Sequence, residues 1–487
     1  MFAQTTPMTA RPMHWRELLA LLLCVFLACL AGIATRPIAF MATFWPANGL
    51  LLGLLLRNPG WALTPLAWGM AYLGYLMADA LTGAGWQNNL VINAINMVGV
   101  YAGWRFLSRQ GPATLGFRRQ RSVLLILVGC MISALTSGVL GTWARSLFFE
   151  SSTWETFAMW TTGEAFNLIL AVPLVLAAPR GWLWQWPWAK VLAPLRRAWG
   201  LPLVALFASE AVAYLLGGPG ALGFAVPAMV WCAMVYGVFP TALLNLVTAL
   251  WGTAAMTQLG LSFVPQHVHD AVSFRVGVAM LSLAPLAVAT AHTLHKQTLQ
   301  ILHRAVNHDF LTGALSRRAL MERGDQQLQR LQREGTPVAT LMLDLDHFKR
   351  VNDQWGHAQG DLVLQQFASL ITRNLRPGEL FGRIGGEEFA LLLPNTTREQ
   401  ALGVSERLCT QLREHVFHSE TGQGIAMTMS IGLHAAQAGH DSYQLGDMLA
   451  RADAALYLAK TSGRDQVQVY EGERMTPLRR HSPVAAT

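Results

Sequence analysis

Acidic residues at the ends of two apolar runs carry the clearest chemistry in this sequence. Asp344 closes the run over residues 338–345, and Glu387 and Glu388 directly follow a pair of glycines. Carboxylates that lie close together repel one another unless they bind cations, and sites with only oxygen ligands suit Mg²⁺ or Mn²⁺. Two such ions can stabilise the attacking and leaving oxygens of an in-line phosphoryl transfer. A glycine pair lets a phosphate chain approach the backbone, because no Cβ intervenes.

The surrounding elements must bring these two acidic groups together. Residues 379–384 and 389–393 have strand patterns on either side of the glycine pair, which predicts a β-hairpin. Other patterns in this region predict helices over residues 402–415 and 447–460 and a strand over residues 426–433. The whole region is therefore expected to be a compact α/β domain. If the strand over residues 338–345 neighbours the hairpin, Asp344 converges with Glu387 and Glu388.

Six motifs occur in a fixed order in the same region. They are residues 309–313 with Arg317 and Arg318, residues 344–353, 356–361, 383–389 and 430–432, and residues 452–457 with Lys460 and Arg464. As a set they resemble the GGDEF diguanylate cyclase family over residues 305–470. The resemblance implies an antiparallel-sheet, nucleotidyl-cyclase-like α/β domain that condenses two GTP molecules into cyclic di-GMP and two pyrophosphates. It also implies a homodimer, since one domain would hold half of the reaction.

The resemblance implies a role for individual positions. Metal binding is implied for Asp344, Glu387 and the Leu345 carbonyl, with Mg²⁺ or Mn²⁺ at two ions per GTP half-site. Glu387 and Glu388 are the implied catalytic residues, and Glu387 matches the position that helps to deprotonate the attacking 3′-hydroxyl. The implied GTP-binding residues are Asn352 and Asp361 for guanine, His357 between them, Gly385 and Gly386 in the hairpin, and Lys349, Lys460 and Arg464 for the phosphates. Lys460 and Arg464 share a helix face if that helix continues through Gly463, and otherwise a turn must bring them together.

One site departs from the family pattern. Product inhibition by cyclic di-GMP normally requires Arg-x-x-Asp, whereas this chain has Arg376, Pro377, Gly378 and Glu379. Glu is longer than Asp, and Pro-Gly alters the turn. Retained product inhibition and weakened or lost product inhibition are therefore equally open, and Arg407 is a candidate second contributor to the site. A catalytically silent domain that binds GTP or cyclic di-GMP as a signalling module is the main alternative to a cyclase.

The first part of the chain has a different composition. Residues 1–299 contain 16 Lys and Arg but only 7 Asp and Glu, whereas residues 300–487 contain 20 and 21. The net charge of +8 therefore belongs to an apolar region, which favours membrane orientation over nucleic-acid binding. The five cysteines form no Cys-x-x-Cys pair, so neither a disulfide framework nor a zinc site is expected.

Apolar runs of bilayer-spanning length recur through this part of the chain. They cover residues 16–36, 38–56, 61–81, 88–108, 122–146, 160–179, 199–217, 220–238, 240–260 and 271–295. We expect eight to ten membrane spans, the lower number applying if some runs are short or re-entrant. With the N-terminus in the cytoplasm, the outer side carries only Arg36, Arg145 and Arg275. The positive-inside rule then predicts a multi-pass protein of the bacterial inner membrane with a cytoplasmic C-terminal domain.

Several polar residues interrupt these apolar runs. Glu164, Asn167, Asn93 and Asn96 could line a ligand pocket, or could form hydrogen bonds between helices that only hold the bundle together. The motif over residues 44–50, with its Trp-Pro and Asn-Gly pairs, resembles the membrane-associated sensor (MASE-type) domains of bacterial signalling proteins. That resemblance implies a sensory unit for an unidentified ligand. Independent transport activity is the alternative.

These patterns predict five segments. They are a cytoplasmic N-terminus over residues 1–15, a membrane sensor over 16–295, a connecting helix over 296–308, the GGDEF domain over 309–470 and a flexible tail over 471–487. The connecting helix contains no Gly or Pro and has a weak heptad stripe that includes Leu294, Ile301 and Ala305. The stripe predicts either a parallel helix pair in a dimer or a packing face against the next domain.

Overall fold

The computed structural model describes residues 13–35, 44–83, 86–144, 153–179, 200–217, 221, 223–258, 268–418, 423–436 and 444–472. The contacts within the chain divide it into two compact units, Met1–Gln297 and Thr298–Thr487. The predicted cytoplasmic N-terminus before residue 13, the tail after residue 472, and Arg36 and Arg145 lie outside the described residues.

The N-terminal unit is built from helices. They are α1 (Trp15–Ala34), α2 (Pro46–Arg57), α3 (Pro59–Ala62), α4 (Pro65–Leu81), α5 (Trp86–Leu107), η1 (Ser108–Gln110), α6 (Pro112–Leu115), α7 (Ser122–Trp143), α8 (Thr153–Ala177), α10 (Leu201–Leu216), α11 (Ala225–Tyr236), α12 (Val238–Gln258) and α13 (Val268–Asn307). Each of the ten predicted spans overlaps one of these helices. Proline begins several of them, for example at Pro46 and Pro65, where its missing N–H leaves no hydrogen bond unmade.

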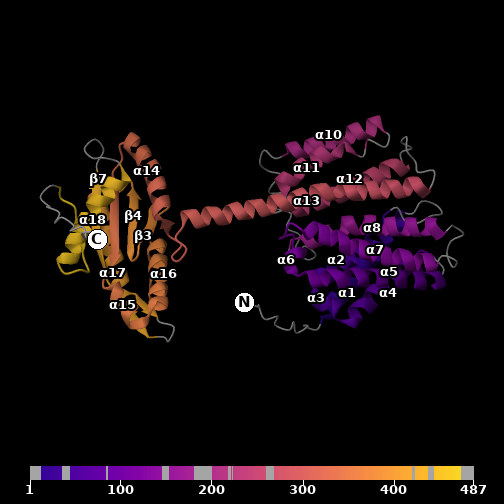
Figure 1. Ribbon diagram of the computed structural model, residues 1–487, viewed down its shortest axis with the longest axis horizontal. Helices are drawn as coiled ribbons and strands as arrows, with labels where there is room; N and C mark the ends of the chain where they lie inside the picture. The colour runs from indigo at the N-terminus through magenta and orange to yellow at the C-terminus, as the bar shows by residue number, and fades with distance from the viewer. Residues whose placement is uncertain are drawn as a thin grey trace, which may run out of the picture. The chain divides into compact units, whose positions relative to one another are not determined.

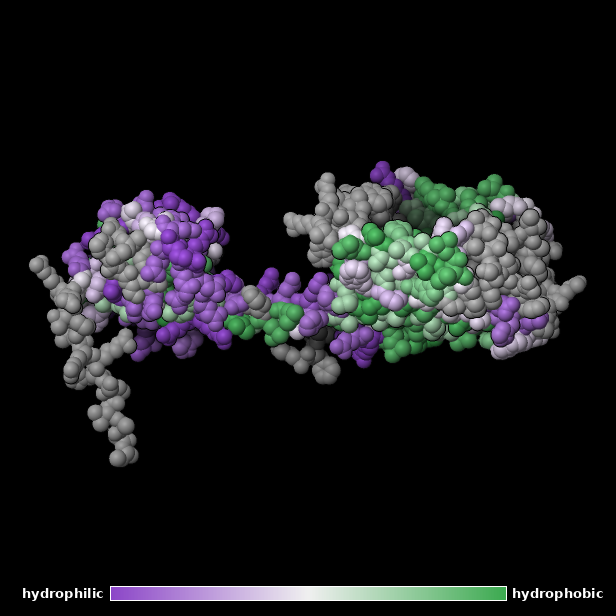
Figure 2. Space-filling model, turned by 90° about the horizontal axis from the view of Figure 1, so that it is seen from above, coloured by the Kyte–Doolittle hydropathy of each residue, from purple (hydrophilic) through white to green (hydrophobic). Residues whose placement is uncertain are grey.

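Five of the described helices are long and apolar enough to cross a membrane, namely α1, α5, α7, α8 and α13. They carry large exposed apolar side chains such as Leu27, Trp143 and Trp154. Figure 2 shows extended green, hydrophobic areas on the surface of the N-terminal unit. An apolar surface of this extent is typical of a protein that contacts lipid.

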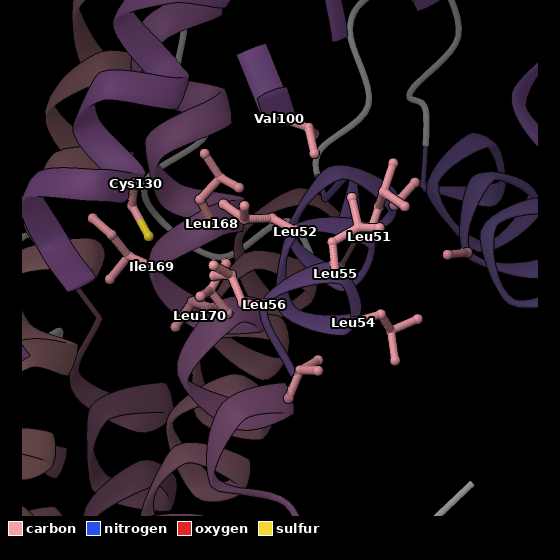
Figure 3. Packing of buried hydrophobic residues seen from close by; sticks show 14 of the residues in the cluster. Leu51, Leu52, Leu54, Leu55, Leu56, Val100, Cys130, Leu168, Ile169 and Leu170 are labelled. Carbon is pink, nitrogen blue, oxygen red and sulfur yellow. The ribbon is translucent and has the colours of Figure 1, made fainter. Parts of the chain in front are cut away.

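The core of the N-terminal unit lies where α2 meets α8. Leu51, Leu52 and Leu55 of α2 are fully buried, and they pack in one cluster with Leu168 and Ile169 of α8 (Figure 3). The short helix α2 is buried along almost its whole length, because α1, α5 and α8 all pack against it.

The C-terminal unit contains a six-stranded sheet with the order β1-β3-β4-β2-β7-β8 (Figure 1). The strands are β1 (Leu315–Ser316), β2 (Val338–Leu345), β3 (Leu380–Gly385), β4 (Glu388–Pro394), β7 (Met429–Ala436) and β8 (Val467–Val469), and a separate pair is formed by β5 (Val416–His418) and β6 (Gly424–Ala426). The four central strands are antiparallel, and only the edge strands β1 and β8 pair in parallel. The predicted antiparallel α/β fold is therefore confirmed.

Helices cover both faces of this sheet. They are α14 (Arg317–Glu334), α15 (Phe348–Trp355), α16 (His357–Arg373), α17 (Arg398–Glu414) and α18 (Leu445–Thr461). Helices α16 and α17 contribute to one buried cluster, while α14 and α18 contribute to another. The central strand β2 is buried at all eight positions because it lies between these two clusters, which explains its continuous apolar run.

Candidate active site

Asp344 lies near the end of β2, opposite the hairpin formed by β3 and β4. In the antiparallel pairing Asp344 is the direct partner of Glu388, and on its other side it pairs with Ser430 of β7. The strand that ends in Asp344 is therefore the hairpin's neighbour, as the convergence of the two acidic groups requires. Lys460 of α18 completes the group, since its Nζ is 2.7 Å from Asp344 Oδ2.

The surroundings of Asp344 favour a cation. Burial raises the pKa of Asp344 to about 6, because desolvation and the charges of Glu387 and Glu388 outweigh the hydrogen bond and charge of Lys460. Among the described residues no three acidic, histidine or cysteine side chains form a metal-binding group. The carboxylates of Glu387 and Glu388 both act on Asp344, and such oxygen donors suit a hard divalent ion.

The tip of the hairpin is open. Gly386 has a φ of +51°, a left-handed conformation that glycine adopts readily. A Cβ placed on Gly385 or Gly386 would meet no atom within 4 Å. Packing within the domain would therefore tolerate a side chain at either position. Without one, the backbone at this turn is exposed and a phosphate can approach it.

Arg383 holds this hairpin in place, a role that the sequence motifs did not indicate. Its Nε and Nη2 both donate to the carbonyl of Gly386, at 2.9 and 2.7 Å, while Nη1 donates to Asp309 Oδ1 at 3.0 Å. Asp309 also accepts hydrogen bonds from the backbone N and the hydroxyl of Thr312. Burial alone would raise the pKa of Asp309, but the bonds from Thr312 and Arg383 hold it below its usual value. Arg383 thus connects the start of the domain to the glycine turn.

The residues implied for guanine lie on two consecutive helices. Asn352 is in α15, and His357 and Asp361 are on exposed positions one turn apart at the start of α16. Gly356 separates the helices with a φ of +82°. Gly360 packs directly against Asn352, because a Cβ on Gly360 would collide with Asn352 Oδ1. The turn at Gly356 and the absence of a side chain at Gly360 therefore leave room for the Asn352 amide between the two helices.

If Asn352 reads guanine, as the resemblance to the GGDEF family implies, replacing Gly360 with Ala should raise KM for GTP about tenfold or more, because the methyl group displaces the Asn352 side chain. The KM should be measured by steady-state kinetics, with kcat much less affected. Gly403→Ala is the matched control, since Gly403 lies within α17 and a Cβ there would meet no atom within 4 Å. An unchanged KM in Gly360→Ala would contradict the guanine-binding role implied for Asn352.

The implied phosphate-binding cations are spread over three positions. Lys349 is exposed in the first turn of α15, and Lys460 is half-buried in the last turn of α18. Helix α18 ends at Thr461, so it does not continue through Gly463. Arg464 instead follows in a turn, with a φ of +65° and its backbone N bonded to the Ala459 carbonyl. A turn, and not a shared helix face, thus relates Arg464 to Lys460.

Asp346 organises that turn. Its carboxylate accepts hydrogen bonds from the hydroxyls of Thr428 and Ser430, at 2.8 and 2.7 Å, and from the backbone N of Asp465 at 3.0 Å. Asp465 in turn accepts two bonds of 2.9 Å from Arg413. With these partners Asp346 supports the strand ends and the loop that carries Arg464. Asp344, two residues earlier, instead pairs with Lys460.

The implied inhibitory site forms a tight turn after α16. The Glu379 carboxylate accepts from the backbone N of Arg376 at 2.7 Å, and the Glu379 N donates to the Arg376 carbonyl at 3.1 Å. Glu379 therefore bends back to close its own turn, which the longer side chain permits. Arg376 and Arg407 of α17 are both exposed.

Comparison with known proteins identifies relatives of both parts of the chain. Residues 306–466 match the family described as "Diguanylate cyclase, GGDEF domain". A protein named probable diguanylate cyclase DgcF, from Escherichia coli O157:H7, is 27% identical over 448 residues, which cover 89% of this chain and 90% of that protein. Diguanylate cyclase DgcP from Pseudomonas aeruginosa is 40% identical over 161 residues, 33% of this chain and 23% of that protein. The solved GGDEF domain of DgcB from Caulobacter crescentus, in complex with c-di-GMP, is 32% identical with a TM-score of 0.32, covering 34% of this chain and 96% of that one.

Proposed function

Residues 306–466 are a GGDEF domain of the diguanylate cyclase family, and from that premise we propose that this protein condenses two GTP molecules into cyclic di-GMP and two pyrophosphates. One observation carries the proposal. The acidic residues Asp344, Glu387 and Glu388 and the cation of Lys460 gather beside an open glycine turn, where a triphosphate could lie against the backbone. The related proteins named as diguanylate cyclases support the same activity.

In the proposed mechanism each domain binds one GTP. Asn352 and Asp361 recognise the guanine edge, and Lys349, Lys460 and Arg464 neutralise the phosphates. Two facing domains bring each 3′-oxygen in line with the α-phosphorus of the other GTP. A bond from the 3′-oxygen to that phosphorus forms, the bond to the β-phosphate oxygen breaks, and pyrophosphate leaves. Glu387 accepts the proton of the 3′-hydroxyl, and Glu388 adds negative charge beside it.

Divalent cations, Mg²⁺ or Mn²⁺ at two per half-site, would neutralise phosphate charge when bound by Asp344, Glu387 and the Leu345 carbonyl. Lys460 holds one Asp344 oxygen at 2.7 Å, so the second oxygen is the one available to such an ion. The raised pKa of Asp344 fits this role, because a carboxyl that is costly to ionise alone gains most from a nearby positive charge.

A homodimer is part of the proposal, and α13 offers a surface for it. Leu299, Leu302 and Val306 are about half exposed and recur with the spacing of one helix face, which differs from the predicted stripe of Leu294, Ile301 and Ala305. Apolar side chains at this heptad spacing are typical of a parallel helix pair. We propose that this face pairs with the same face of a second copy and sets the geometry of the two cyclase domains.

Replacing Leu302 with Glu is expected to weaken dimerisation about 100-fold or more, because two charges would enter an apolar seam. Activity per protomer should fall with the dimer fraction and recover partly at high protein concentration. The mass of the purified full chain, measured by sedimentation, and its turnover of GTP check this. Gln300→Glu places the same charge on an exposed position off this face and should leave both unchanged. Dimers of normal strength in Leu302→Glu would contradict the assignment of this face.

For the N-terminal unit we propose a MASE-type sensor in the bacterial inner membrane, with the cyclase domain in the cytoplasm. The five membrane-capable helices support it, as does the similarity to the DgcF protein, which extends over 89% of this chain and so includes the apolar part. A signal could alter activity only by binding two arrangements of the dimer with different affinity.

The decisive experiment is turnover of GTP by the full chain in lipid nanodiscs with Mg²⁺, with cyclic di-GMP identified by mass spectrometry. The expected result is stoichiometric formation of one cyclic di-GMP and two pyrophosphates from two GTP. A folded dimer that binds GTP without turnover would overturn the proposal in favour of a silent signalling module.

A further inference from the structure

The N-terminal unit contains a buried carboxylate that the cyclase reaction does not use. Glu164 of α8 is 6% exposed and accepts hydrogen bonds at 2.9 Å from Asn48 Nδ2 to both of its oxygens. Among the described residues no lysine, arginine or histidine forms an ion pair with it. An ionised carboxylate without a counter-charge is costly inside a membrane protein, and such residues are commonly functional.

Asn48 is held in one orientation. The hydroxyl of Tyr75 in α4 donates to Asn48 Oδ1 at 2.6 Å, and both residues are fully buried. Because the amide oxygen is engaged by Tyr75, the amide nitrogen points at Glu164. The chain from Tyr75 through Asn48 to Glu164 therefore connects α4, α2 and α8 by hydrogen bonds.

The motif over residues 44–50 builds this network. The backbone N of Trp45 donates to Asn167 Oδ1 at 2.9 Å, which fixes the start of α2 against α8. A Cβ on Gly49 would lie 2.6 Å from the Cβ of Ala171, so only glycine allows the two helices to come this close. The leucines that follow pack into the same helix contact (Figure 3). Asn93 lies in a separate contact between α5 and α4, where its amide donates to Asp79 Oδ2 at 2.7 Å.

The other titratable groups around Glu164 are weak acids or are occupied elsewhere. Tyr75 and Cys130 of α7 interact with its charge, and Cys29 of α1 lies near Tyr75. Helix α12, which packs on α8, has no titratable side chain. Two arginines lie on neighbouring helices: Arg57 of α2 donates to the carbonyls of Val175 and Pro179, and Arg275 of α13 donates to the carbonyl of Met159. None of these groups supplies a compensating charge to Glu164.

We infer that Glu164 is a proton-binding input site of the membrane unit, switched between a carboxylate that accepts from Asn48 and a carboxylic acid. The close packing of α2 on α8 at Gly49 favours a proton over a larger ligand. As a carboxylate, Glu164 accepts from Asn48 Nδ2. As an acid it carries an O–H donor, which Asn48 can accept only if its amide turns over and gives up the bond from Tyr75. Uptake of one proton from water would therefore rearrange the contact between three helices.

A route to the output helix begins one residue from Glu164. The Nη1 of Arg275, on α13, lies 3.2 Å from the position of a Cβ on Gly163, and Arg275 is half-buried. Any displacement of α8 at Glu164 changes this contact, and α13 extends from there to Asn307. Two packed helices that slide past each other are a common means of switching.

The test combines infrared difference spectroscopy with cyclic di-GMP output, both on the full chain in nanodiscs across a pH series. The expected result is a carboxylic-acid carbonyl band that titrates in the wild type and is lost in Glu164→Gln, which mimics the protonated form. The cyclic di-GMP output of Glu164→Gln should stay at the level that the wild type reaches at low pH, whatever the pH. Glu210→Gln, which removes a membrane-unit carboxyl outside the network, is the control and should keep the pH dependence of the wild type. The output measurement rests on the proposed cyclase activity, whereas the infrared band does not. Failure of the cyclase proposal can therefore be told apart from failure of the proton-site proposal. A band that survives in Glu164→Gln would overturn the proposal.

Tyr75→Phe keeps the proposal testable if Glu164→Gln does not fold. Loss of the hydroxyl frees Asn48 to turn its oxygen toward the acid, which favours the protonated form. The midpoint of the infrared titration should therefore move to higher pH by about 0.5–1 unit, the equivalent of one net hydrogen bond. A midpoint that moves to lower pH or does not move would overturn the network as the switch. A band that follows Na⁺ concentration at fixed pH would overturn the proton in favour of a metal cation.

Discussion

Glu387→Gln is expected to lower kcat for cyclic di-GMP formation by about 10²–10⁴-fold, the range for loss of a positioned general base. The amide cannot accept the proton of the 3′-hydroxyl, and it removes one of the two carboxylates available to a divalent ion. Since Gln has nearly the shape of Glu and the side chain is half-buried, the fold should be unaffected. Single-turnover kinetics with saturating GTP isolate the chemical step from binding.

Two controls separate chemistry from structure in this experiment. Glu406→Gln makes the same substitution at an exposed carboxylate of α17 and should retain full activity. The concentration of Mg²⁺ that gives half-maximal rate should rise in Glu387→Gln, because Asp344 then acts with the Leu345 carbonyl alone. If Glu387→Gln retained more than about a tenth of wild-type turnover at every Mg²⁺ concentration, Glu387 would be neither base nor essential ligand.

The strands and the hairpin of the cyclase domain could be predicted because local patterns determine them. The run over residues 338–345 is apolar at nearly every position because β2 is buried on both faces. The glycine pair marks a turn because Gly386 needs a positive φ. Once β2 and β4 are neighbours and their apolar runs are in register, Asp344 lies opposite Glu388.

Contacts between distant segments could not be predicted in the same way. Asp344 and Asp346 look alike in the sequence, yet one is bonded to Lys460 and the other to Thr428, Ser430 and Asp465. Which acid faces the open turn depends on strands and loops more than 80 residues apart along the chain. The partner of Glu164 was missed for a similar reason, because Asn48 is 116 residues away and nothing in the local pattern favours it over Asn93 or Asn96.

Arg383→Ala is expected to destabilise the C-terminal unit by about 2–4 kcal/mol, because it leaves a mostly buried carboxylate without its cation. The side chains of Arg383 and Asp309 are only 13% and 18% exposed, so water screens the pair weakly. The Gly386 carbonyl also loses two donors, and the freed turn should lower kcat about tenfold or more. Thermal unfolding of the full chain and GTP turnover measure the two effects.

Arg398→Ala is the matched control for this change. Arg398 pairs with Glu471 at 3.1 Å, but the two side chains are 52% and 67% exposed, so its loss should cost at most about 1 kcal/mol. The folded pKa of Asp309 is lowered, so the stability from its pair is complete above its unfolded value, near 3.9, and is lost as the pH falls through the folded value. The difference in stability between wild type and Arg383→Ala should therefore shrink below about pH 4. Equal destabilisation by the two arginine variants at neutral pH would show that the contact of Arg383 with Asp309 and Gly386 does not hold the turn.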